Sequence, residues 1–267
     1  MSVFREDILK DRVAFVTGGG SGICKGIARA LMAHGARTTI VGRKAERLEA
    51  AAQELAGETG SQCLAAPADV RDAPGVERAI DATLERYGRL DIVVNGAAGN
   101  FLCPAAQLSY NGFRTVMEID TVGTYNVSKA CFDKALSRSG GSILNISATL
   151  HYGATPLQTH ASAAKAAVDS LTRSLALEWG SLGIRVNGIA PGPIDETEGV
   201  TRLVPPNMKK KLESHIPVGR FGRISEIAAI AVFLSSDAAS LITGATLVAD
   251  GGAWLAGPGI GMAMGME

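Results

Sequence analysis

The sequence has no excess of charge of either sign. Among its 267 residues, 26 lysines and arginines balance 26 aspartates and glutamates, so the formal net charge at pH 7 is zero. Nucleic acids and anionic membrane surfaces attract proteins through an excess of basic side chains. The longest basic run, Lys209-Lys210-Lys211, is short, and we interpret it as a solvated helix face. We therefore expect neither a nucleic acid nor a membrane among the partners.

Long apolar runs and paired cysteines are also missing. No run approaches the roughly 18 apolar residues of a membrane-spanning helix, and the first residues do not resemble a signal peptide. The four cysteines show neither a Cys-x-x-Cys pair nor the spacing of zinc ligands. We expect reduced, buried thiols in a cytoplasmic protein without a bound metal. The Gly- and Met-rich end, residues 257–267, is predicted to be a mobile tail or a subunit-contact arm.

What the sequence does contain is an alternation of short apolar runs with helical patterns. Apolar residues make up 46% of the chain, and the β-branched runs are typical of strands buried on both faces of a parallel sheet. We expect a single α/β domain over residues 1–267, with a doubly wound, Rossmann-type and mostly parallel sheet. Seven strands are predicted, at residues 12–17, 38–41, 63–66, 90–95, 142–146, 184–189 and 246–250.

A glycine-rich turn follows the first predicted strand and leads into a helix predicted over residues 23–34. Glycine lets the backbone approach a pyrophosphate closely, and the amino end of a helix favours its negative charge. Strand, turn and helix together predict a dinucleotide site. Cys24 stands where a third glycine is usual, and we interpret it as a buried structural cysteine. The residues of this turn that are predicted to contact the cofactor are Gly18, Gly20, Ser21, Gly22 and Ile23.

The residues after the second predicted strand indicate which dinucleotide is bound. An NAD enzyme places a carboxylate near this strand end to bond the ribose 2′-hydroxyl. This chain instead has Gly42-Arg43-Lys44, with no carboxylate before Glu46. Because a planar guanidinium pairs well with phosphate oxygens, Arg43 predicts NADPH.

Three later segments complete a pattern that resembles the short-chain dehydrogenase/reductase family. Asp69-Val70 follows the third strand, Asn95 to Gly99 follows the fourth, and Pro191 to Ile194 follows the sixth. They match the family's adenine-contacting Asp, its Asn-Ala-Gly motif and the segment along the nicotinamide, and the resemblance extends over residues 10–255. The further cofactor contacts that it implies are Asp69, Val70, Asn95, Ala97, Ala98, Gly99, Lys165, Pro191, Gly192, Ile194 and Thr197.

The residues with which this family protonates an alkoxide are absent. The family's Tyr lies four residues before the helical lysine, here Lys165, and that position holds Ala161. The Ser thirteen residues before the Tyr would fall at Ala148, and Asp120 replaces the Asn of the preceding helix. Either the chain makes no alkoxide, or it is a catalytically silent NADPH-binding protein.

These departures resemble the peroxisomal-type 2,4-dienoyl-CoA reductases, in which the Tyr is missing, Asp replaces Asn and the lysine is kept. The resemblance implies NADPH-dependent reduction of a 2,4-dienoyl-CoA to a trans-3-enoyl-CoA in the β-oxidation of unsaturated fatty acids. It also implies a homotetramer that pairs long helices at about residues 105–136 and 155–179 and docks the C-terminal strand across a two-fold axis. Eukaryotic relatives end in a peroxisomal signal, so a peroxisomal location is the alternative to a cytoplasmic one. A reductase of another conjugated enoyl thioester or of a ketone is the alternative activity.

A conjugated thioester does not need the missing Tyr. Hydride added at the δ carbon spreads charge as a dienolate onto the thioester oxygen, which needs hydrogen-bond donors. Lys165 is predicted to bond the nicotinamide ribose and to stabilise the dienolate. Asp120 is predicted to hold the water that protonates the α carbon, or else to be a purely structural partner of Lys165. His151, Tyr152 and His160 are the alternative acids, or else walls of the pocket.

For the substrate, the resemblance implies a set of contacts outside the cofactor site. Phe101 is expected to wall the acyl channel near a turn at residues 109–111, and two arginines are expected to meet the CoA phosphates or else to be solvated. Residues 197–215 are predicted to form a mobile lid. The predicted substrate contacts are Arg71, Phe101, Ser109, Tyr110, Asn111 and Arg202.

Overall fold

The fold is built around a parallel sheet. A computed structural model describes residues 4–204 and 206–256, except for the side chains of Arg202, Leu203 and Pro206. In this part of the chain the sheet has seven strands in the order β3-β2-β1-β4-β5-β6-β7, and every neighbouring pair is parallel. The strands are β1 (Val13–Thr17), β2 (Arg37–Gly42), β3 (Cys63–Pro67), β4 (Ile92–Asn95), β5 (Gly141–Ile146), β6 (Ile184–Pro191) and β7 (Thr246–Ala249).

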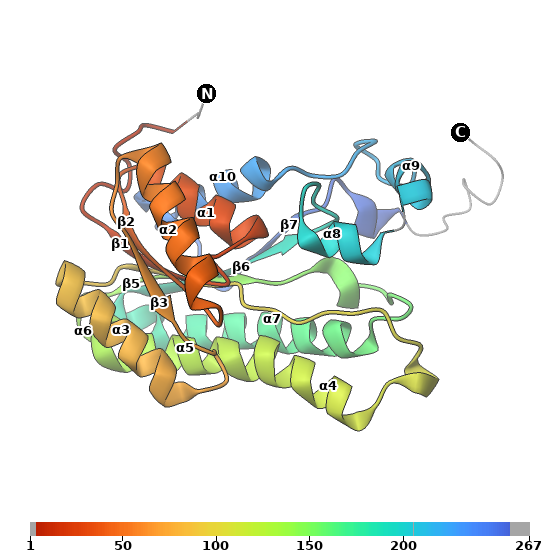
Figure 1. Cartoon of the computed structure of the whole chain (residues 1–267), viewed down its shortest axis with the longest axis horizontal. Helices are drawn as coiled ribbons and strands as arrows, with labels where there is room; N and C mark the ends of the chain where they lie inside the picture. Colours follow the sequence, from red (N-terminus) through yellow and green to blue (C-terminus); the bar gives the residue numbers. More distant parts are fainter. Residues whose placement is uncertain (1–3, 205, 257–267) are drawn as a thin grey trace.

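Helices cover both faces of this sheet (Figure 1). One face carries α1 (Gly22–Ala33), α2 (Ala45–Thr59) and α10 (Ile224–Ser235). The other carries α3 (Ala73–Tyr87), α4 (Tyr110–Met117), α5 (Gly123–Cys131) and α7 (Thr159–Trp179). Shorter helices are α6 (Ser137–Ser139), α8 (Glu198–Leu203) and α9 (Lys209–Glu213). None of the helices in the described part of the chain has both the length and the apolar character needed to cross a membrane.

Alternation along each strand divides the core between these two faces. In β1, Ala14 and Val16 pack with α1 and α10, whereas Phe15 packs with α3 and α5 on the opposite face. All three side chains are fully buried. A strand that is apolar at successive positions therefore fills two cores at once, as the continuous apolar runs predicted.

All seven predicted strands are present in the described residues, with ends shifted by at most two positions. The predicted starts of two helices are wrong. The helix expected from residue 105 begins at Tyr110, because the Ser109 hydroxyl caps it by accepting a bond from the Gly112 N–H at 3.0 Å. The helix expected from residue 155 begins at Thr159, because Pro156 disfavours helix at the preceding residue and Leu157 has a left-handed φ of 67°. The segment 257–267, predicted to be a tail or arm, lies outside the described residues.

Candidate active site

The candidate site lies at the carboxyl ends of the central strands, where an open parallel sheet binds its ligands. The glycine-rich turn after β1 docks there on the loop after β4 through one side chain. The Thr17 hydroxyl accepts hydrogen bonds from the N–H groups of Gly96 at 3.0 Å and Ala97 at 3.2 Å, and donates to the Val94 carbonyl. The two predicted cofactor segments are thereby held side by side.

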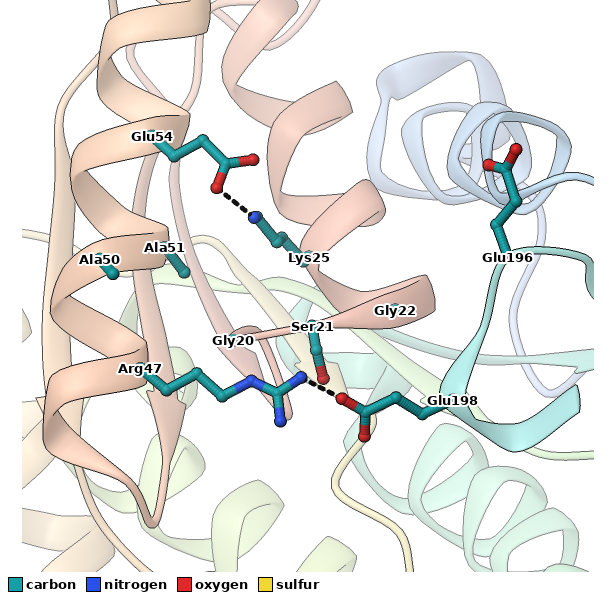
Figure 2. A pocket seen from close by; sticks show the side chains of 10 residues that line it. All are labelled: Gly20, Ser21, Gly22, Lys25, Arg47, Ala50, Ala51, Glu54, Glu196 and Glu198. Atoms are coloured by element: carbon teal, nitrogen blue, oxygen red, sulfur yellow. Dashed lines mark hydrogen bonds and ion pairs between the residues drawn. The ribbon is translucent and has the colours of Figure 1, made fainter. Parts of the chain in front are cut away.

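The turn itself has the shape that a dinucleotide phosphate requires. Gly18 has φ of 70°, and a Cβ there would lie 2.8 Å from the Gly96 carbonyl oxygen, so a side chain is excluded. Gly20, Ser21 and Gly22 line a cavity of about 400 Å³ between α1, α2 and the segment before α8 (Figure 2). Ser21 is the N-cap of α1, but its side chain makes no capping hydrogen bond, so the helix's first N–H groups are not satisfied by it. These features fit a bound pyrophosphate.

Arg43 and Asp69 lie at the ends of neighbouring strands. Arg43 is exposed in the loop between β2 and α2. Asp69 follows β3 and is engaged by Arg71, whose Nη2 lies 2.6 Å from Asp69 Oδ2 and whose backbone N–H donates to Oδ1. These bonds from Arg71 hold the pKa of Asp69 below its usual range, and Arg43 acts weakly in the same direction. Arg71, predicted to meet CoA, thus pairs with a residue predicted to meet the cofactor.

Asp120 and Lys165 form a buried ion pair at the centre of the site. Lys165 Nζ lies 3.0 Å from Asp120 Oδ2 and donates a hydrogen bond of 2.9 Å to the Ile146 carbonyl at the end of β5. The other carboxylate oxygen of Asp120 accepts a bond of 2.7 Å from the Gly99 N–H. Asp120 is 1% exposed and belongs to a π-helical segment, Glu118–Val122, inserted between α4 and α5. Such insertions are frequent at functional sites, and this one joins the helix, the β4 loop and α7.

Ala161 occupies the position of the family's Tyr and is buried, so no phenol is present at this point of α7. Ala148 occupies the position of the family's Ser in the loop after β5. Its neighbour Ser147 is buried, and its hydroxyl has no hydrogen-bond partner among the described residues. The Lys165 ammonium and the Asp120 carboxylate are therefore the charged groups at the centre of the described site.

Buried polar atoms without partners gather around this pair. In the described residues, unpartnered atoms include Asn95 Oδ1, Asn100 Oδ1, Ser147 Oγ and both ring nitrogens of His160. Asn95 is the last residue of β4, Asn100 and Ser147 lie in the segments after β4 and β5, and His160 lies on α7. A buried polar atom without a partner is costly and usually marks the place of a water or a ligand. Their concentration here fits a site that binds a polar group.

Asn95 also has a structural role. Its side-chain amide donates to Ser128 Oγ and Asn145 Oδ1, both at 2.9 Å, and so ties β4 to α5 and β5. Val70 is buried and its carbonyl accepts a bond of 3.0 Å from Asn126. Asn95 and Val70, both predicted to contact the cofactor, thus also hold the loops of the site in place.

His160 and Phe101 form a stacked pair beside Asp120. Their ring centroids are 4.1 Å apart with an interplanar angle of 24°. His160 is fully buried, and burial lowers its pKa, although the Phe101 backbone and the Asp120 carboxylate act in the opposite direction. A buried imidazole with a lowered pKa stays neutral at pH 7. Phe101, the predicted wall of the acyl channel, therefore stacks on a neutral imidazole.

His151 and Tyr152, the alternative acids, both bond Asp169, one helical turn beyond Lys165 on α7. His151 Nε2 lies 2.9 Å and the Tyr152 hydroxyl 3.2 Å from Asp169 Oδ2. Burial and the Asp169 charge raise the pKa of Tyr152 to about 12. The phenol already donates its proton to a carboxylate, which makes it a poor acid for a substrate carbon.

The remaining predicted substrate contacts cluster only in part. Ser109 caps α4, and Tyr110 and Asn111 that follow it are exposed, Tyr110 by 94%. This end of α4 does reach Phe101, because a Cβ at Gly112 would lie 3.2 Å from Phe101 Cζ. The side chain of Arg202 lies outside the described residues.

The segment after β6 leads from the site into the predicted lid. Gly192 packs against Asp250, and Ile194 is buried and forms a parallel bridge with Gly222. Thr197 caps α8: its hydroxyl accepts from the Val200 N–H at 3.2 Å and donates to the Ile194 carbonyl at 2.7 Å. The start of the predicted lid is thus bonded to the segment that follows β6, and Pro205 within it lies outside the described residues.

Cys24 is interpreted correctly as a buried cysteine. It is 6% exposed, and a Cβ at Gly96 would overlap its Sγ, so the thiol fills the contact between α1 and the β4 loop. Burial raises its pKa to about 12. The thiol is therefore protonated and unreactive at neutral pH.

Sequence reasoning missed several residues that the fold brings to the site. These are Ile146, whose carbonyl holds Lys165, and Arg47 and Glu198, which line the cavity of Figure 2. Gly99 was predicted as a cofactor contact, but the bond from its N–H to Asp120 was not. Backbone groups have no sequence signal. Arg47 had one, because it is a second arginine four residues after Arg43, at the start of α2.

Comparison with known proteins agrees with this geometry. Residues 18–253 match the family model described as enoyl-(acyl carrier protein) reductase. A Danio rerio protein named peroxisomal 2,4-dienoyl-CoA reductase, (3E)-enoyl-CoA-producing, is 52% identical over 95% of this chain and 85% of its own length. A protein of the same name from Arabidopsis thaliana is 47% identical over 96% of this chain and 89% of its own. A Bacillus subtilis protein named probable 2,4-dienoyl-CoA reductase, (2E)-enoyl-CoA-producing, is 41% identical over 92% and 98%.

Solved structures agree in fold. The citronellol catabolism dehydrogenase of Pseudomonas aeruginosa superimposes with a TM-score of 0.84 at 36% identity, over 95% of this chain and 99% of that one. A short-chain dehydrogenase from Bacillus anthracis gives 0.84 at 40%, over 92% and 97%. Sheet order, glycine-rich turn and central lysine define an oxidoreductase that binds a nicotinamide cofactor. The chain belongs to the short-chain dehydrogenase/reductase family.

Proposed function

We infer that this chain is a 2,4-dienoyl-CoA reductase that forms a (3E)-enoyl-CoA. One observation carries the mechanism: the site has a buried Asp120–Lys165 pair and lacks the family's Tyr. A ketone reductase without an acid would leave its alkoxide unprotonated, whereas a dienoyl thioester delocalises its charge. Degradation of unsaturated acyl chains is the process that such a reaction serves.

NADPH is the proposed cofactor. When it is bound, its nicotinamide supplies the hydride that reduces the diene. The turn at Gly18–Ile23 would hold the pyrophosphate, Arg43 the 2′-phosphate, and the segment Pro191–Thr197 the nicotinamide. Support comes from the exposed Arg43 at the end of β2, where no carboxylate is present to favour a free 2′-hydroxyl.

Lys165 and Asp120 divide the chemistry between them. The Lys165 ammonium, which donates to the Ile146 carbonyl, would donate to the nicotinamide ribose and place positive charge where the dienolate develops. Asp120 accepts from Lys165 and from Gly99 N–H, which fixes its carboxylate at the site. We assign it to orient the water that delivers a proton to the α carbon of the substrate.

The test is consumption of NADPH or NADH by purified protein with a 2,4-dienoyl-CoA, a trans-2-enoyl-CoA and a simple ketone. We expect turnover of the dienoyl-CoA, with NADPH used in preference to NADH. The double-bond position in the product, determined by NMR, distinguishes a 3-enoyl product from the 2-enoyl product named for the Bacillus relative. Reduction of the ketone, or binding of NADPH without any turnover, would contradict the proposal.

A further inference from the structure

A chain of buried polar side chains connects the helical segment that carries Asp120 to the helix that carries Lys165, and the proposed function leaves it unexplained. It runs from α5, through the ends of β4 and β5, to α7, on the face of the sheet that these helices cover (Figure 1). None of its residues is more than 6% exposed. The members are Thr124, Ser128, Asn95, Asn145 and Thr172.

The hydrogen bonds of this chain start from Asn95 and run to both helices. The Asn95 amide donates to Ser128 Oγ and to Asn145 Oδ1, both at 2.9 Å. On one side, Ser128 donates to the Thr124 carbonyl at 2.8 Å. On the other, the Asn145 amide donates to Thr172 Oγ1, also at 2.8 Å. A buried network of this kind favours one packing geometry, because a shifted helix would leave a polar group unpaired.

Thr124 is the member of the chain that reaches the residue with the proposed chemistry. Its hydroxyl donates a hydrogen bond of 2.6 Å to the backbone carbonyl of Asp120, four residues earlier. The helix is π-helical at this point, since the Gly123 N–H bonds to the Glu118 carbonyl, five residues back. π-Helical insertions and threonine hydroxyls that bond an earlier carbonyl both bend helices. The turn that presents Asp120 is therefore held by a side chain as well as by its backbone.

The orientation of this turn matters, because the Asp120 carboxylate meets groups from two other elements at once. One oxygen lies 3.0 Å from Lys165 Nζ on α7, and the other accepts a bond of 2.7 Å from the Gly99 N–H in the loop after β4. The neighbouring Thr121 hydroxyl donates to the Ala164 carbonyl of α7 at 3.3 Å. Hydrogen bonds weaken steeply as distance and angle depart from their optimum. A small rotation of the turn would therefore weaken one of these contacts.

We propose that Thr124 is a positioning residue for the reduction: its hydroxyl fixes the turn that carries Asp120, and the buried chain behind it keeps this turn in register with α7. The inference rests on the proposed function, in which Asp120 orients the water that protonates the α carbon. After hydride addition at the δ carbon, one proton at the α carbon gives the 3-enoyl product, and one proton at the γ carbon gives the 2-enoyl product. A displaced Asp120 slows protonation at the α carbon, so the share of the 2-enoyl product rises.

The experiment compares Thr124→Val, which keeps the branched shape but removes the hydroxyl, with Thr124→Ser, which keeps the hydroxyl. Thr124→Val is expected to lower kcat about five- to fiftyfold, because small displacements of a reacting group cost up to about 100-fold in rate. The KM for the dienoyl-CoA and the Kd for NADPH should change by less than about twofold. NMR of the product should show a larger 2-enoyl share. Thr124→Ala, which places no methyl group against the Asp120 carbonyl, should act in the same direction, and Thr124→Ser should behave as the wild type.

Thr83→Val is the matched control. Thr83 is fully buried on α3, away from the site, and its hydroxyl also donates to a carbonyl four residues back, that of Ala79, at 2.8 Å. It lies 3.0 Å from Thr39 Oγ1 as well. Thr83→Val should therefore lose at least as much free energy of unfolding in urea as Thr124→Val. Its kcat and its product should stay those of the wild type.

A second measurement reports the position of Asp120 without turnover. The Gly99 amide is protected by its bond to Asp120, so its hydrogen–deuterium exchange, followed by mass spectrometry of the surrounding peptide, should be faster in Thr124→Val. Thr83→Val corrects for the loss of global stability and should leave this exchange slower than Thr124→Val does.

Three outcomes would overturn the proposal. Equal changes of kcat and product in Thr124→Val and Thr83→Val would reduce Thr124 to a part of the core. A loss in Thr124→Ser as large as in Thr124→Val would show that shape, and not the hydroxyl, is what counts. Unchanged Gly99 exchange in Thr124→Val would show that Asp120 keeps its place without the bond. A wild-type protein that does not reduce a dienoyl-CoA, but whose Gly99 exchange responds as expected, would contradict the proposed function alone.

Discussion

At the scale of single residues, Asp120 is held by two partners of different kinds. Its carboxylate is shared between the Lys165 ammonium and the Gly99 N–H, and almost none of it reaches solvent. Removing one member of a buried ion pair leaves the other charge unpaired, which destabilises the fold. A test of its catalytic role must therefore keep the shape and the Gly99 contact. Asparagine does both, but it carries no charge, so the free energy of unfolding of the variant has to be measured beside its activity.

Asp120→Asn is expected to lower kcat for the dienoyl-CoA by about 10²- to 10⁴-fold, the usual contribution of a positioned general acid or base. The NADPH Kd should change by less than about twofold, since no cofactor contact is assigned to this carboxylate. Tyr152→Phe is the matched control and should retain activity, because its hydroxyl serves Asp169. Full activity of Asp120→Asn together with loss in Tyr152→Phe would make Tyr152 the acid.

Arg43 determines the cofactor in our proposal. Arg43→Ala removes one charged contact to the 2′-phosphate, so the KM for NADPH should rise by roughly tenfold or more. The KM for NADH, which lacks this phosphate, should stay almost unchanged. Steady-state kinetics with both cofactors checks this, and equal use of both by the wild-type protein would refute it.

His160 should make folding stability depend on pH. Burial lowers its pKa below the ordinary value of 6.5. As the pH falls, this histidine is therefore protonated in the unfolded chain before it is protonated in the folded protein. The stability that this ring contributes is complete above pH 6.5 and is lost as the pH falls below that value. Urea unfolding at pH 8 and pH 5.5 should show a smaller loss for His160→Phe, which keeps the stack on Phe101, than for the wild type. Equal losses would contradict the prediction.

At the scale of secondary-structure elements, α1 packs closely against α10. Gly26 of α1 faces Ile224 at the start of α10, and a Cβ there would overlap Ile224 Cγ2. Cys24 fills the neighbouring contact with the β4 loop. The spacing of α1 from the rest of the fold therefore depends on small residues, although only one of the two is glycine.

Gly26→Ala is expected to destabilise the protein by about 1–3 kcal/mol, because overpacking forces the helices apart. Gly57→Ala is a suitable control: Gly57 is also helical, in α2, but a Cβ there meets nothing within 4 Å. This change should be neutral or stabilise by up to about 1 kcal/mol, since alanine is the better helix former. Chemical unfolding of the two variants measures the difference, and equal effects would show that α10 tolerates the added methyl group.

At the scale of the whole molecule, apolar side chains remain exposed on the helices predicted to pair subunits. Val122 and Tyr125, at the start of α5, are exposed by 46% and 45%, and Leu177 of α7 by 86%. Ala164 and Val168 of α7 face the core, whereas its other small residues, Ala163, Ala166 and Ala167, are only partly covered. An apolar, small-residue helix face of this kind permits close approach of a second copy.

We therefore expect a homotetramer of two-fold symmetry. Light scattering at micromolar concentration should give the mass of four chains, and Leu177→Glu should reduce it to two or one. Leu241→Glu changes a leucine that is 96% exposed outside both helices and should leave the mass unchanged. A monomeric wild-type protein would refute the assembly.

Much of this molecule is determined by local sequence. The seven strands, the turn at Gly18–Ile23, the basic residue at position 43 and the alanine at position 161 all follow from short patterns. Strands buried on both faces need continuous apolar runs, and a phosphate-binding turn needs glycine at fixed positions. The absence of the family's Tyr can be read from the sequence, because its position is counted from Lys165. The starts of α4 and α7 were predicted wrongly, because the hydroxyl cap at Ser109 and the left-handed Leu157 outweighed the helical pattern.

Only the tertiary structure decided which charged groups meet. Lys165 pairs with Asp120 from another helical segment, Arg47 pairs with Glu198 at the start of α8, and His151 and Tyr152 are bound to Asp169. The sequence named most of these side chains and offered Lys165 as a partner of Asp120, but it left the other partners open. The reason is physical: an ion pair or hydrogen bond acts over a few ångströms, and the residues that come that close are set by how helices pack on the sheet. A backbone donor such as the Gly99 N–H leaves no trace in the sequence at all.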